Sequence, residues 1–312
     1  MKKYARPRNF REFVGQSRIK KILKIMIDSS LNQHCSIDHI LIYGPQGTGK
    51  TTLAEVIANE RKANIKHAQG PLLEKKSDML VLLSNIKKGD IIFIDEMHGI
   101  NKNIEELLYS ALEENVIDIP FGPDGDIKIV RMKIPDFTLI GATTKLDKIS
   151  KPLRERFGLI KKIEEYKLVD IQKISRQFLN NKKILFEEEA IIKLSLYCNL
   201  NPRKCINILK RTIDYTISKN EKIITKFIIL KIISILGIHK HGLIDEHFYY
   251  LKYLQNLNYA SIDLMSGWLN MSKQYIENEL EPPLIKMLYI EKTSRGRSIT
   301  ELGKSKIKNQ KY

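Results

Sequence analysis

The sequence predicts an α/β fold, with a parallel sheet and covering helices, followed by a small helical domain and a C-terminal winged helix. Three observations lead to this prediction. An apolar run at residues 39–43 passes through a glycine-rich loop into a helical pattern. Two further apolar runs, within residues 90–95 and 137–144, suit strands that are buried on both faces of a parallel sheet. Helical patterns and then a basic hairpin fill the rest of the chain. The predicted domains are residues 1–167, 168–238 and 239–312.

The composition is that of a globular protein with an excess of positive charge. The chain has 312 residues, of which 43% are hydrophobic, and this excludes a disordered chain. No apolar run approaches the length of a membrane span, and no apolar segment follows the basic N-terminus. We therefore expect a cytoplasmic protein with no membrane partner. The net charge of +17 favours a polyanion partner, although a compositional bias towards Lys, Ile and Asn also contributes.

The cysteines indicate neither a metal site nor a disulfide framework. Their number is odd and their spacing does not match metal ligands, so we expect free thiols in a reducing compartment. The three are Cys35, Cys198 and Cys205. A redox pair of the last two is the less favoured alternative. We expect the single tryptophan, Trp268, in a core.

The glycine-rich loop has the spacing of a phosphate-binding loop. Gly44 and the run Gly49-Lys50-Thr51 fit the pattern G-x-x-x-x-G-K-[ST]. Glycines let backbone N–H groups approach a phosphate, and the helix that follows presents its N-terminus to the same anion. We expect Lys50 to reach the β- and γ-phosphates and the Thr51 hydroxyl to bind Mg²⁺. A chance glycine-rich turn is the alternative, which the flanking strand and helix patterns disfavour.

Two carboxylates and two hydroxyls follow the apolar runs and predict hydrolysis. Asp95 and Glu96 come at the C-terminal end of their strand, where open α/β sheets bind ligands. Asp95 can hold Mg²⁺, and Glu96 can polarise the attacking water. Thr143 and Thr144 end the next buried run, where a hydroxyl can sense the γ-phosphate or position the water. Solvated carboxylates at a strand end are the alternative.

Two arginines lie in the segment 152–158, after the predicted sheet. Arg154 or Arg156 can act as an arginine finger that one subunit donates to its neighbour's nucleotide. An ion pair with Glu155 is the alternative. Further on, Arg203 opens a helix in the predicted helical domain, from which it can face the nucleotide.

A β-hairpin is predicted at residues 116–132, because turn residues separate two runs of alternating polarity. If the hairpin projects, apolar residues such as Ile119, Phe121 and Ile127 are exposed and favour a partner protein. Packing against the hairpin's own domain is equally consistent with the pattern.

The C-terminal part gives three helical patterns between residues 245 and 287, then a hairpin at 288–300. Pro282-Pro283 should kink or interrupt the third helix. Three helices followed by a hairpin with a basic tip predict a winged helix that contacts DNA, with a solvated basic turn as the alternative. We expect phosphate contacts from Lys292, Arg295 and Arg297. Residues 304–311 should be a frayed tail.

Taken together, these blocks resemble the AAA+ ATPases and, more closely, the RuvB family of Holliday junction branch migration motors. The resemblance spreads over nearly the whole chain and keeps the order of that family. The blocks that carry it are residues 13–16, 44–52, 95–98, 137–144, 152–158, 202–203 and 292–297. It implies a large AAA+ ATPase domain, a small helical lid domain and a winged-helix domain.

The resemblance also implies an activity and partners. The expected activity is an ATP-dependent, Mg²⁺-dependent motor, a homohexameric ring that pumps duplex DNA at Holliday junctions. RuvA is expected to bind through the hairpin 117–132, and RuvC to resolve the junction. The expected setting is homologous recombination and DNA repair, including the SOS response to DNA damage.

The resemblance supports the residue roles derived from the motifs and adds others. Ala5 and Arg6 match positions at the adenine end of the nucleotide, and Tyr166 matches a further nucleotide contact. Arg156 matches the arginine finger and Arg203 the second sensor. The expected catalytic set is Lys50, Asp95, Glu96, Thr144 and Arg156. The expected phosphate contacts are Gly47, Gly49, Lys50, Thr51 and Thr52, with Thr51 and Asp95 on the metal. Glu113, Glu114 and Asn115 match a stretch that faces the neighbouring subunit's nucleotide.

The sequence departs from the family pattern at a few positions. Gln46 and Thr48 occupy spacer positions of the loop, and Gly99 stands where arginine is frequent. Lys292 replaces a more usual arginine, which keeps the charge but loses bidentate geometry. A clamp-loader-type AAA+ ATPase is the alternative function, and it predicts a helical collar at the C-terminus instead of a wing. A DNA-binding regulator with a vestigial ATPase fold is disfavoured by the intact catalytic set.

Overall fold

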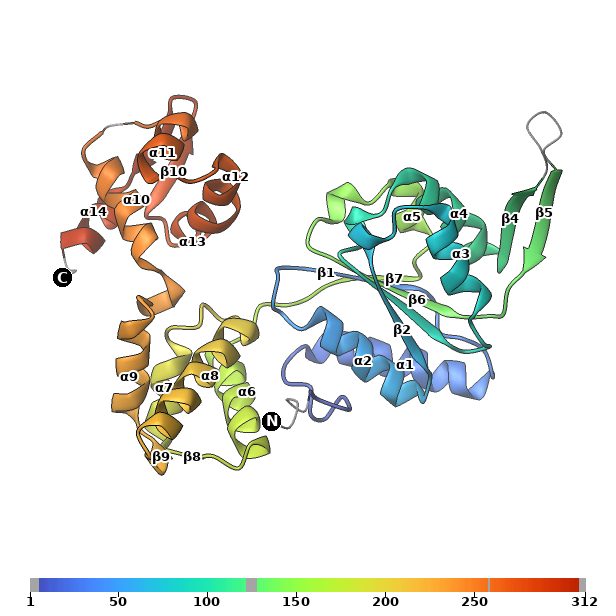
Figure 1. Cartoon of the computed structure of the whole chain (residues 1–312), viewed down its shortest axis with the longest axis horizontal. Helices are drawn as coiled ribbons and strands as arrows, with labels where there is room; N and C mark the ends of the chain where they lie inside the picture. Colours follow the sequence, from blue (N-terminus) through green and yellow to red (C-terminus); the bar gives the residue numbers. More distant parts are fainter. Residues whose placement is uncertain (1–5, 122–127, 258, 309–312) are drawn as a thin grey trace. The chain divides into compact units, whose positions relative to one another are not determined.

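The computed structural model describes residues 6–121, 128–257 and 259–308, and the chain divides into two compact units (Figure 1). The first unit comprises residues 1–183 together with 201–206. The second comprises residues 184–200 and 207–312. The division into three domains at residues 167 and 238 stays a prediction.

The first unit is built on a five-stranded sheet in the order β2-β3-β6-β1-β7, and all of its pairings are parallel. The strands are β1 (Ile40–Tyr43), β2 (Ile65–Gln69), β3 (Ile91–Asp95), β6 (Thr138–Thr143) and β7 (Leu159–Lys162). The predicted parallel sheet is therefore confirmed. β1 and β6 run in register from Ile40 opposite Ile140 to Tyr43 opposite Thr143, so their carboxyl ends meet at one edge.

Helices cover both faces of this sheet (Figure 1). Side chains of β3 alternate between the two faces: Phe93 packs with α1 and α2, whereas Ile92 and Ile94 pack with the helices of the opposite face. One face carries α1 (Ser17–Asn32) and α2 (Lys50–Arg61). The other carries α3 (Lys76–Ser84), α4 (Lys102–Glu113) and α5 (Lys151–Glu155), and α6 (Leu168–Asn181) follows β7. Short 3-10 turns η1 (Gly70–Leu72), η2 (Met97–Gly99) and η3 (Leu146–Lys148) join these elements.

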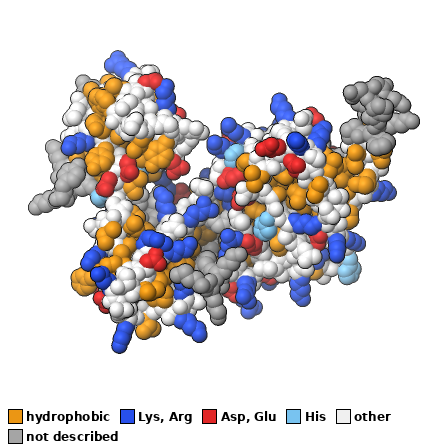
Figure 2. Space-filling model, viewed as in Figure 1, with side chains coloured by type: hydrophobic (Ala, Val, Ile, Leu, Met, Phe, Trp, Pro, Cys, Tyr) orange, Lys and Arg blue, Asp and Glu red, His pale blue; other side chains and the backbone are white. Residues whose placement is uncertain are grey.

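The predicted hairpin is present as β4 (Val116–Phe121) and β5 (Lys128–Lys133), paired in antiparallel register. It extends away from the sheet of the first unit (Figure 1). Ile129 is 71% exposed and Val130 51%, and Figure 2 shows hydrophobic side chains over the hairpin and the face beside it. Ile119 is partly buried against the core, whereas Ile127 and the Phe121 side chain lie outside the described part. The hairpin therefore projects and still packs through its base.

The second unit begins with a helical part. Its elements are α7 (Glu188–Ser195), α8 (Pro202–Ser218), which starts in the first unit, and α9 (Lys226–Ile235). Two short strands, β8 (Leu185–Phe186) and β9 (Ile223–Ile224), pair in parallel, and the sequence did not predict them because two residues show no alternation. The 3-10 turn η4 (Lys240–Gly242) follows. No helix in the described ranges is long and apolar enough to cross a membrane.

The rest of the second unit is a winged helix, as predicted. It contains α10 (Asp245–Gln255), α11 (Ile262–Leu269), α12 (Lys273–Tyr275), the π-helical turn η5 (Ile276–Leu280) and α13 (Glu281–Lys286). The wing is β10 (Ile290–Thr293) and β11 (Gly296–Ile299), and α14 (Glu301–Lys308) follows it. The interruption expected at Pro282-Pro283 takes the form of the widened turn η5 just before them, and both prolines lie in the first turn of α13, where their missing N–H groups are not needed.

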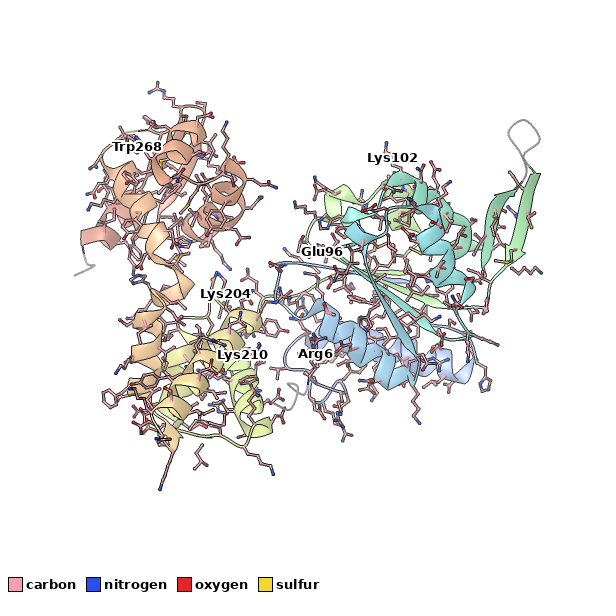
Figure 3. All side chains as sticks on the ribbon, viewed as in Figure 1. Arg6, Glu96, Lys102, Lys204, Lys210 and Trp268 are labelled. Carbon is pink, nitrogen blue, oxygen red and sulfur yellow. The ribbon has the colours of Figure 1, made fainter. Side chains whose placement is uncertain are left out.

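Two expectations for this part were wrong. Of the tail expected at 304–311, residues 304–308 are helical, because Thr300 caps α14 by accepting a hydrogen bond from the Gly303 N–H at 3.1 Å, and residues 309–311 lie outside the described part. Trp268, labelled in Figure 3, is 42% exposed and lies beside Tyr253, with ring centroids 5.2 Å apart. The core of this part is instead formed by residues such as Tyr250, Leu251 and Met265.

Candidate functional site

The glycine-rich loop joins β1 to α2 and ends at the helix N-terminus. Gly47 and Gly49 have φ angles of 78° and 96°, a region that residues with a Cβ rarely occupy. A Cβ on Gly47 would also lie 2.6 Å from Asn201 Oδ1. The loop therefore needs glycine at these two positions, and it leads directly into the N-terminus of α2, where anions bind favourably. Thr52 lies in the first turn of that helix, next to Thr51.

Lys50 is buried inside this loop, with 6% of its surface exposed. Its Nζ donates hydrogen bonds to the carbonyl oxygens of Gly44 at 2.8 Å and Pro45 at 3.0 Å. Burial lowers the pKa of Lys50, while the charges of Glu96 and Asp95 act in the opposite direction. Both of its acceptors are neutral, so the ammonium group keeps its charge available for an anion in the loop.

The phosphate loop and strand β3 meet at Thr51 and Asp95. The Thr51 hydroxyl donates a hydrogen bond to Asp95 Oδ2 at 2.9 Å, and Asp95 Oδ1 accepts one from the Glu96 N–H at 3.0 Å. A hydroxyl and a carboxylate this close suit Mg²⁺, which prefers oxygen ligands and often takes only one or two from the protein. The residues present therefore fit the expected metal ion.

Glu96 lies at the end of the sheet, with its backbone in the left-handed region at φ 47° (Figure 3). Its Oε2 accepts a hydrogen bond from the Thr144 hydroxyl at 3.3 Å, and His98 Nδ1 lies 3.3 Å from the same oxygen. His98 Nδ1 also lies 3.0 Å from the hydroxyl of Thr143, which is fully buried. With a carboxylate oxygen beside it, Nδ1 is favoured as the protonated nitrogen of the ring. Two strand ends and the turn η2 thus hold one carboxylate in place.

Tyr166 closes the other side of the loop. Its hydroxyl donates to the Thr48 carbonyl at 3.0 Å, and burial raises the pKa of Tyr166. Gln16 ties this segment to the N-terminal arm, because its amide both donates to the Glu164 carbonyl and accepts from the Glu164 N–H, each at 2.8 Å. Arg6 pairs with Glu55 of α2, and Ala5 lies outside the described residues.

The first turn of α8 packs on the phosphate loop. Asn201 Nδ2 donates to the Gln46 carbonyl at 2.8 Å, and the Arg203 N–H approaches the Gly47 carbonyl at 3.3 Å. Asn201 Oδ1 also accepts from the backbone N–H groups of Arg203 at 3.0 Å and Lys204 at 3.2 Å, which is the geometry of a helix N-cap. Arg203 is thereby placed next to the loop, and its charge contributes to lowering the pKa of Lys50.

The predicted arginine finger is paired within its own chain. Arg156 Nη2 donates to Glu113 Oε2 at 2.9 Å, and its guanidinium lies 4.5 Å from the ring centroid of Tyr109. Glu114 accepts from Arg131 of the hairpin at 3.3 Å. Asn115, with φ 55°, makes the turn between α4 and β4. The structure therefore joins Arg156 with the stretch 113–115 and not with the phosphate loop.

The three predicted DNA-contacting residues lie on the wing but differ in their surroundings. Lys292 and Arg297 are directly opposite each other in the β10–β11 register. Arg297 is paired with Glu277 and Glu281, whereas Arg295 is exposed at the tip of the hairpin.

Two residues of the nucleotide site were missed by sequence analysis. No sequence pattern marks His98, because a contact between its ring and Glu96 two residues before it has no characteristic spacing. Asn201 precedes Pro202 at the start of a helix, which is the signature of an N-cap, and this signal could have identified it. Both cysteines of the possible redox pair, Cys198 and Cys205, are buried free thiols.

Comparison with known proteins gives consistent matches over the whole chain. The family model described as "Holliday junction DNA helicase RuvB P-loop domain" matches residues 5–163, and that described as "RuvB C-terminal winged helix domain" matches residues 240–308. The "Holliday junction branch migration complex subunit RuvB" of Mycoplasmopsis pulmonis is 47% identical, covering 97% of both chains. The protein of the same name from Mesomycoplasma hyopneumoniae is 49% identical, covering 96% of this chain and 95% of its own. A solved structure titled "Thermotoga maritima RuvB Holliday junction branch migration motor" has a TM-score of 0.83 at 32% identity, covering 99% of this chain and 100% of its own.

Proposed function

The chain belongs to the RuvB family of Holliday junction branch migration proteins, and from this premise we propose how its P-loop ATPase site works. The chain is a P-loop ATPase of that family and acts in branch migration. The observation that carries the mechanism is the meeting of Thr51, Asp95 and Glu96 beside the phosphate loop. The clamp-loader alternative predicted a helical collar, and residues 240–308 form a winged helix instead.

In our proposal, ATP lies in the loop with its phosphates against the backbone N–H groups of Gly47, Gly49 and the first turn of α2. Lys50 supplies positive charge to the β- and γ-phosphates, and Thr52 contacts them from the helix. Thr51 and Asp95 would hold Mg²⁺, which when bound neutralises charge that develops on the phosphates. Arg6 and Tyr166, with Ala5 before them, contribute to the adenine end of the same site.

Glu96 is the proposed group that polarises the attacking water. Its carboxylate is held by Thr144 and His98, so its free oxygen can be aimed at one position. Positioning of this kind accounts for a large share of catalysis in phosphoryl transfer. His98 is therefore a positioning residue that acts through Glu96, and Thr144 links the same carboxylate to the γ-phosphate.

Arg156 is the proposed arginine finger for a neighbouring subunit's nucleotide in a homohexameric ring. In this chain it is paired with Glu113, and that surface pair is weak enough to exchange for a triphosphate. Glu113, Glu114 and Asn115 then face the same neighbouring site. Arg203, held beside the loop by Asn201, is the proposed second sensor of the nucleotide in its own subunit.

The remaining partners follow from the family. We propose that the wing, through Lys292, Arg295 and Arg297, contacts the DNA backbone, which the net charge of +17 supports. The exposed apolar hairpin 117–132 is the proposed contact with RuvA, and RuvC is the proposed resolving partner. The ring then pumps duplex DNA during recombination and DNA repair in the cytoplasm, with a role in the SOS response to DNA damage.

The proposal is tested by the DNA-stimulated ATPase activity of Lys50→Ala. Removing the buried ammonium group should abolish turnover, whereas Lys24→Ala on the exposed face of α1 is the matched control and should keep it. Turnover of Lys50→Ala at the wild-type rate would exclude the loop as the hydrolytic site.

A further inference from the structure

The wing is anchored to a buried carboxylate. Glu281, in the first turn of α13, is fully buried, and its Oε1 accepts hydrogen bonds from Tyr250 Oη at 2.9 Å and Arg297 Nε at 2.8 Å. Lys292 Nζ lies 2.5 Å from the other oxygen, Oε2. The widened turn η5 directly precedes Glu281 and brings Glu277 onto the same side, where it pairs with Arg297 Nη2 at 2.8 Å.

Glu281 stays ionised because its partners favour the carboxylate form. Burial raises the pKa of Glu281, but the contacts with Arg297, Lys292 and Tyr250 together outweigh burial and hold that pKa below its usual range. The hydroxyl of Tyr250 stays protonated, because burial and the neighbouring carboxylate raise its pKa. At neutral pH the wing therefore contains a permanent negative charge directly beneath its basic residues.

The two oxygens of this carboxylate are not held equally. Oε1 has two donors in good geometry, whereas Oε2 is buried and receives no well-directed hydrogen bond from the described residues. Lys292 therefore holds Oε2 by its charge at short range and not by a directed hydrogen bond. Of the contacts that Glu281 makes with Tyr250, Arg297 and Lys292, the one with Lys292 is the most easily exchanged for another partner.

The three basic residues of the wing differ in their exposure and in the carboxylates that they contact. The Arg297 side chain is 13% exposed and bridges two carboxylates. The Lys292 side chain is 45% exposed, so a phosphate can reach its ammonium group while Glu281 lies on the other side. Arg295 is exposed, lies 5.9 Å from the ring centroid of Tyr259, and pairs with no carboxylate in the described part of the chain.

We propose that Glu281 is an internal counter-ion of the wing, which competes with DNA phosphate for Lys292 and keeps Arg297 in place. Arg297 then acts as a positioning residue, which narrows the phosphate contacts proposed above to Lys292 and Arg295. The inference rests on the proposed contact between wing and DNA. Arg297 stays in place because its departure would leave the buried carboxylate with Lys292 as its one cationic partner among the described residues. Lys292 is at the water boundary, where its ion pair is screened and can exchange. Arg295 makes its phosphate contact without giving up an internal partner.

The test measures duplex DNA binding by the full chain as a function of salt. Glu281→Gln is compared with Glu291→Gln, a matched control on β10 that changes the net charge equally and whose carboxylate accepts from Ser298. Freeing Lys292 adds one phosphate contact, so the slope of log K against log salt should steepen by about 0.9 per wing bound. Between about 50 and 200 mM salt, that adds about a 3.5-fold loss of affinity. Glu291→Gln should change the slope much less.

The substitution Glu281→Gln in a Lys292→Gln variant shows which basic residue is released from Glu281. In Lys292→Gln, the substitution Glu281→Gln should no longer steepen the slope. A gain that persists there would show that Arg297 is released instead, and a slope of Glu281→Gln equal to that of Glu291→Gln would show that only net charge matters. Either result overturns the inference. If the unchanged chain binds no DNA at all, the proposed function fails first.

A third comparison covers the case in which Glu281→Gln does not fold, as judged by its melting curve. Lys292→Gln and Arg295→Gln remove exposed side chains. Arg295→Gln should make the slope shallower by about 0.9 and lower the affinity more than Lys292→Gln, because Lys292 must leave Glu281 to bind phosphate. Equal losses in the two variants would contradict competition by Glu281.

Discussion

Asn201 offers the sharpest test of how the first turn of α8 supports the nucleotide site. Its side chain makes two kinds of contact: a cap on the backbone N–H groups of Arg203 and Lys204, and a hydrogen bond to the Gln46 carbonyl at 2.8 Å. Loss of a helix cap costs about 1 kcal/mol, and loss of one hydrogen bond costs about 1 kcal/mol. Asn201→Ala should therefore weaken the docking of this turn on the loop by about 2 kcal/mol.

The two contributions can be separated. Asn201→Ser keeps a capping oxygen but is too short to reach Gln46, so it should lose only about 1 kcal/mol. Because the docked turn lies against Gly47, we expect nucleotide affinity to follow docking. The upper limits are about 30-fold weaker ATP binding for Asn201→Ala and about 5-fold for Asn201→Ser.

The assay is equilibrium binding of a fluorescent ATP analogue to the full chain, with Asn180→Ala, an exposed position near the end of α6, as the control. Affinity should fall in the order control, Asn201→Ser, Asn201→Ala. A folded Asn201→Ala protein that binds the analogue as tightly as the control would refute the coupling between α8 and the loop. A serine variant as weak as the alanine variant would refute the division into two contributions.

Three further predictions concern other parts of the molecule. Arg156→Ala should bind ATP normally but hydrolyse it about 10³-fold more slowly. Rings mixed with Lys50→Ala subunits should recover part of the hydrolysis, and no recovery would argue against an arginine finger that acts between subunits. His98→Ala should lower kcat for ATP about 10- to 100-fold with little change in KM. His98→Gln can still donate a hydrogen bond to Thr143 and should lower kcat less. A change confined to KM would exclude a role through Glu96. The pKa of Glu281 is lowered in the folded state, so the unfolded state binds more protons as the pH falls. The stability that Glu281 contributes is therefore present above its ordinary pKa of 4.5 and is lost as the pH falls below that value. The difference in melting temperature between the unchanged chain and Glu281→Gln should accordingly shrink below about pH 4.5, and a difference independent of pH would contradict the paired carboxylate.

Most of the fold was predictable because its signals are local. The buried runs of β1, β3 and β6, and the glycines around Lys50, are contiguous in sequence and have one physical explanation each. Trp268 and the two-residue strands β8 and β9 were not predictable, because exposure and pairing there depend on tertiary neighbours. Residue type predicts Trp268 in a core, yet its helix faces it outward beside Tyr253.

Individual residues of the candidate site were predictable, but the contacts between them were not. The motif predicts Asp95 and Glu96, but not that Glu96 is held by His98, which needs the turn η2 to bring the ring back onto the strand end. The wing likewise predicts a positive tip, but the acid beneath it comes from α13, after the π-helical turn. A count of basic residues therefore overestimates the charge that is free to meet a phosphate.

We propose that ATP hydrolysis at the phosphate loop drives movement of a four-way DNA junction. Branch migration of a synthetic four-way junction by the full chain, with and without RuvA, tests this most directly. We predict ATP-dependent conversion of the junction into duplex products that is stimulated by RuvA and abolished in Lys50→Ala. Conversion by Lys50→Ala at the rate of the unchanged chain, or none by the unchanged chain with RuvA and ATP present, would contradict the account.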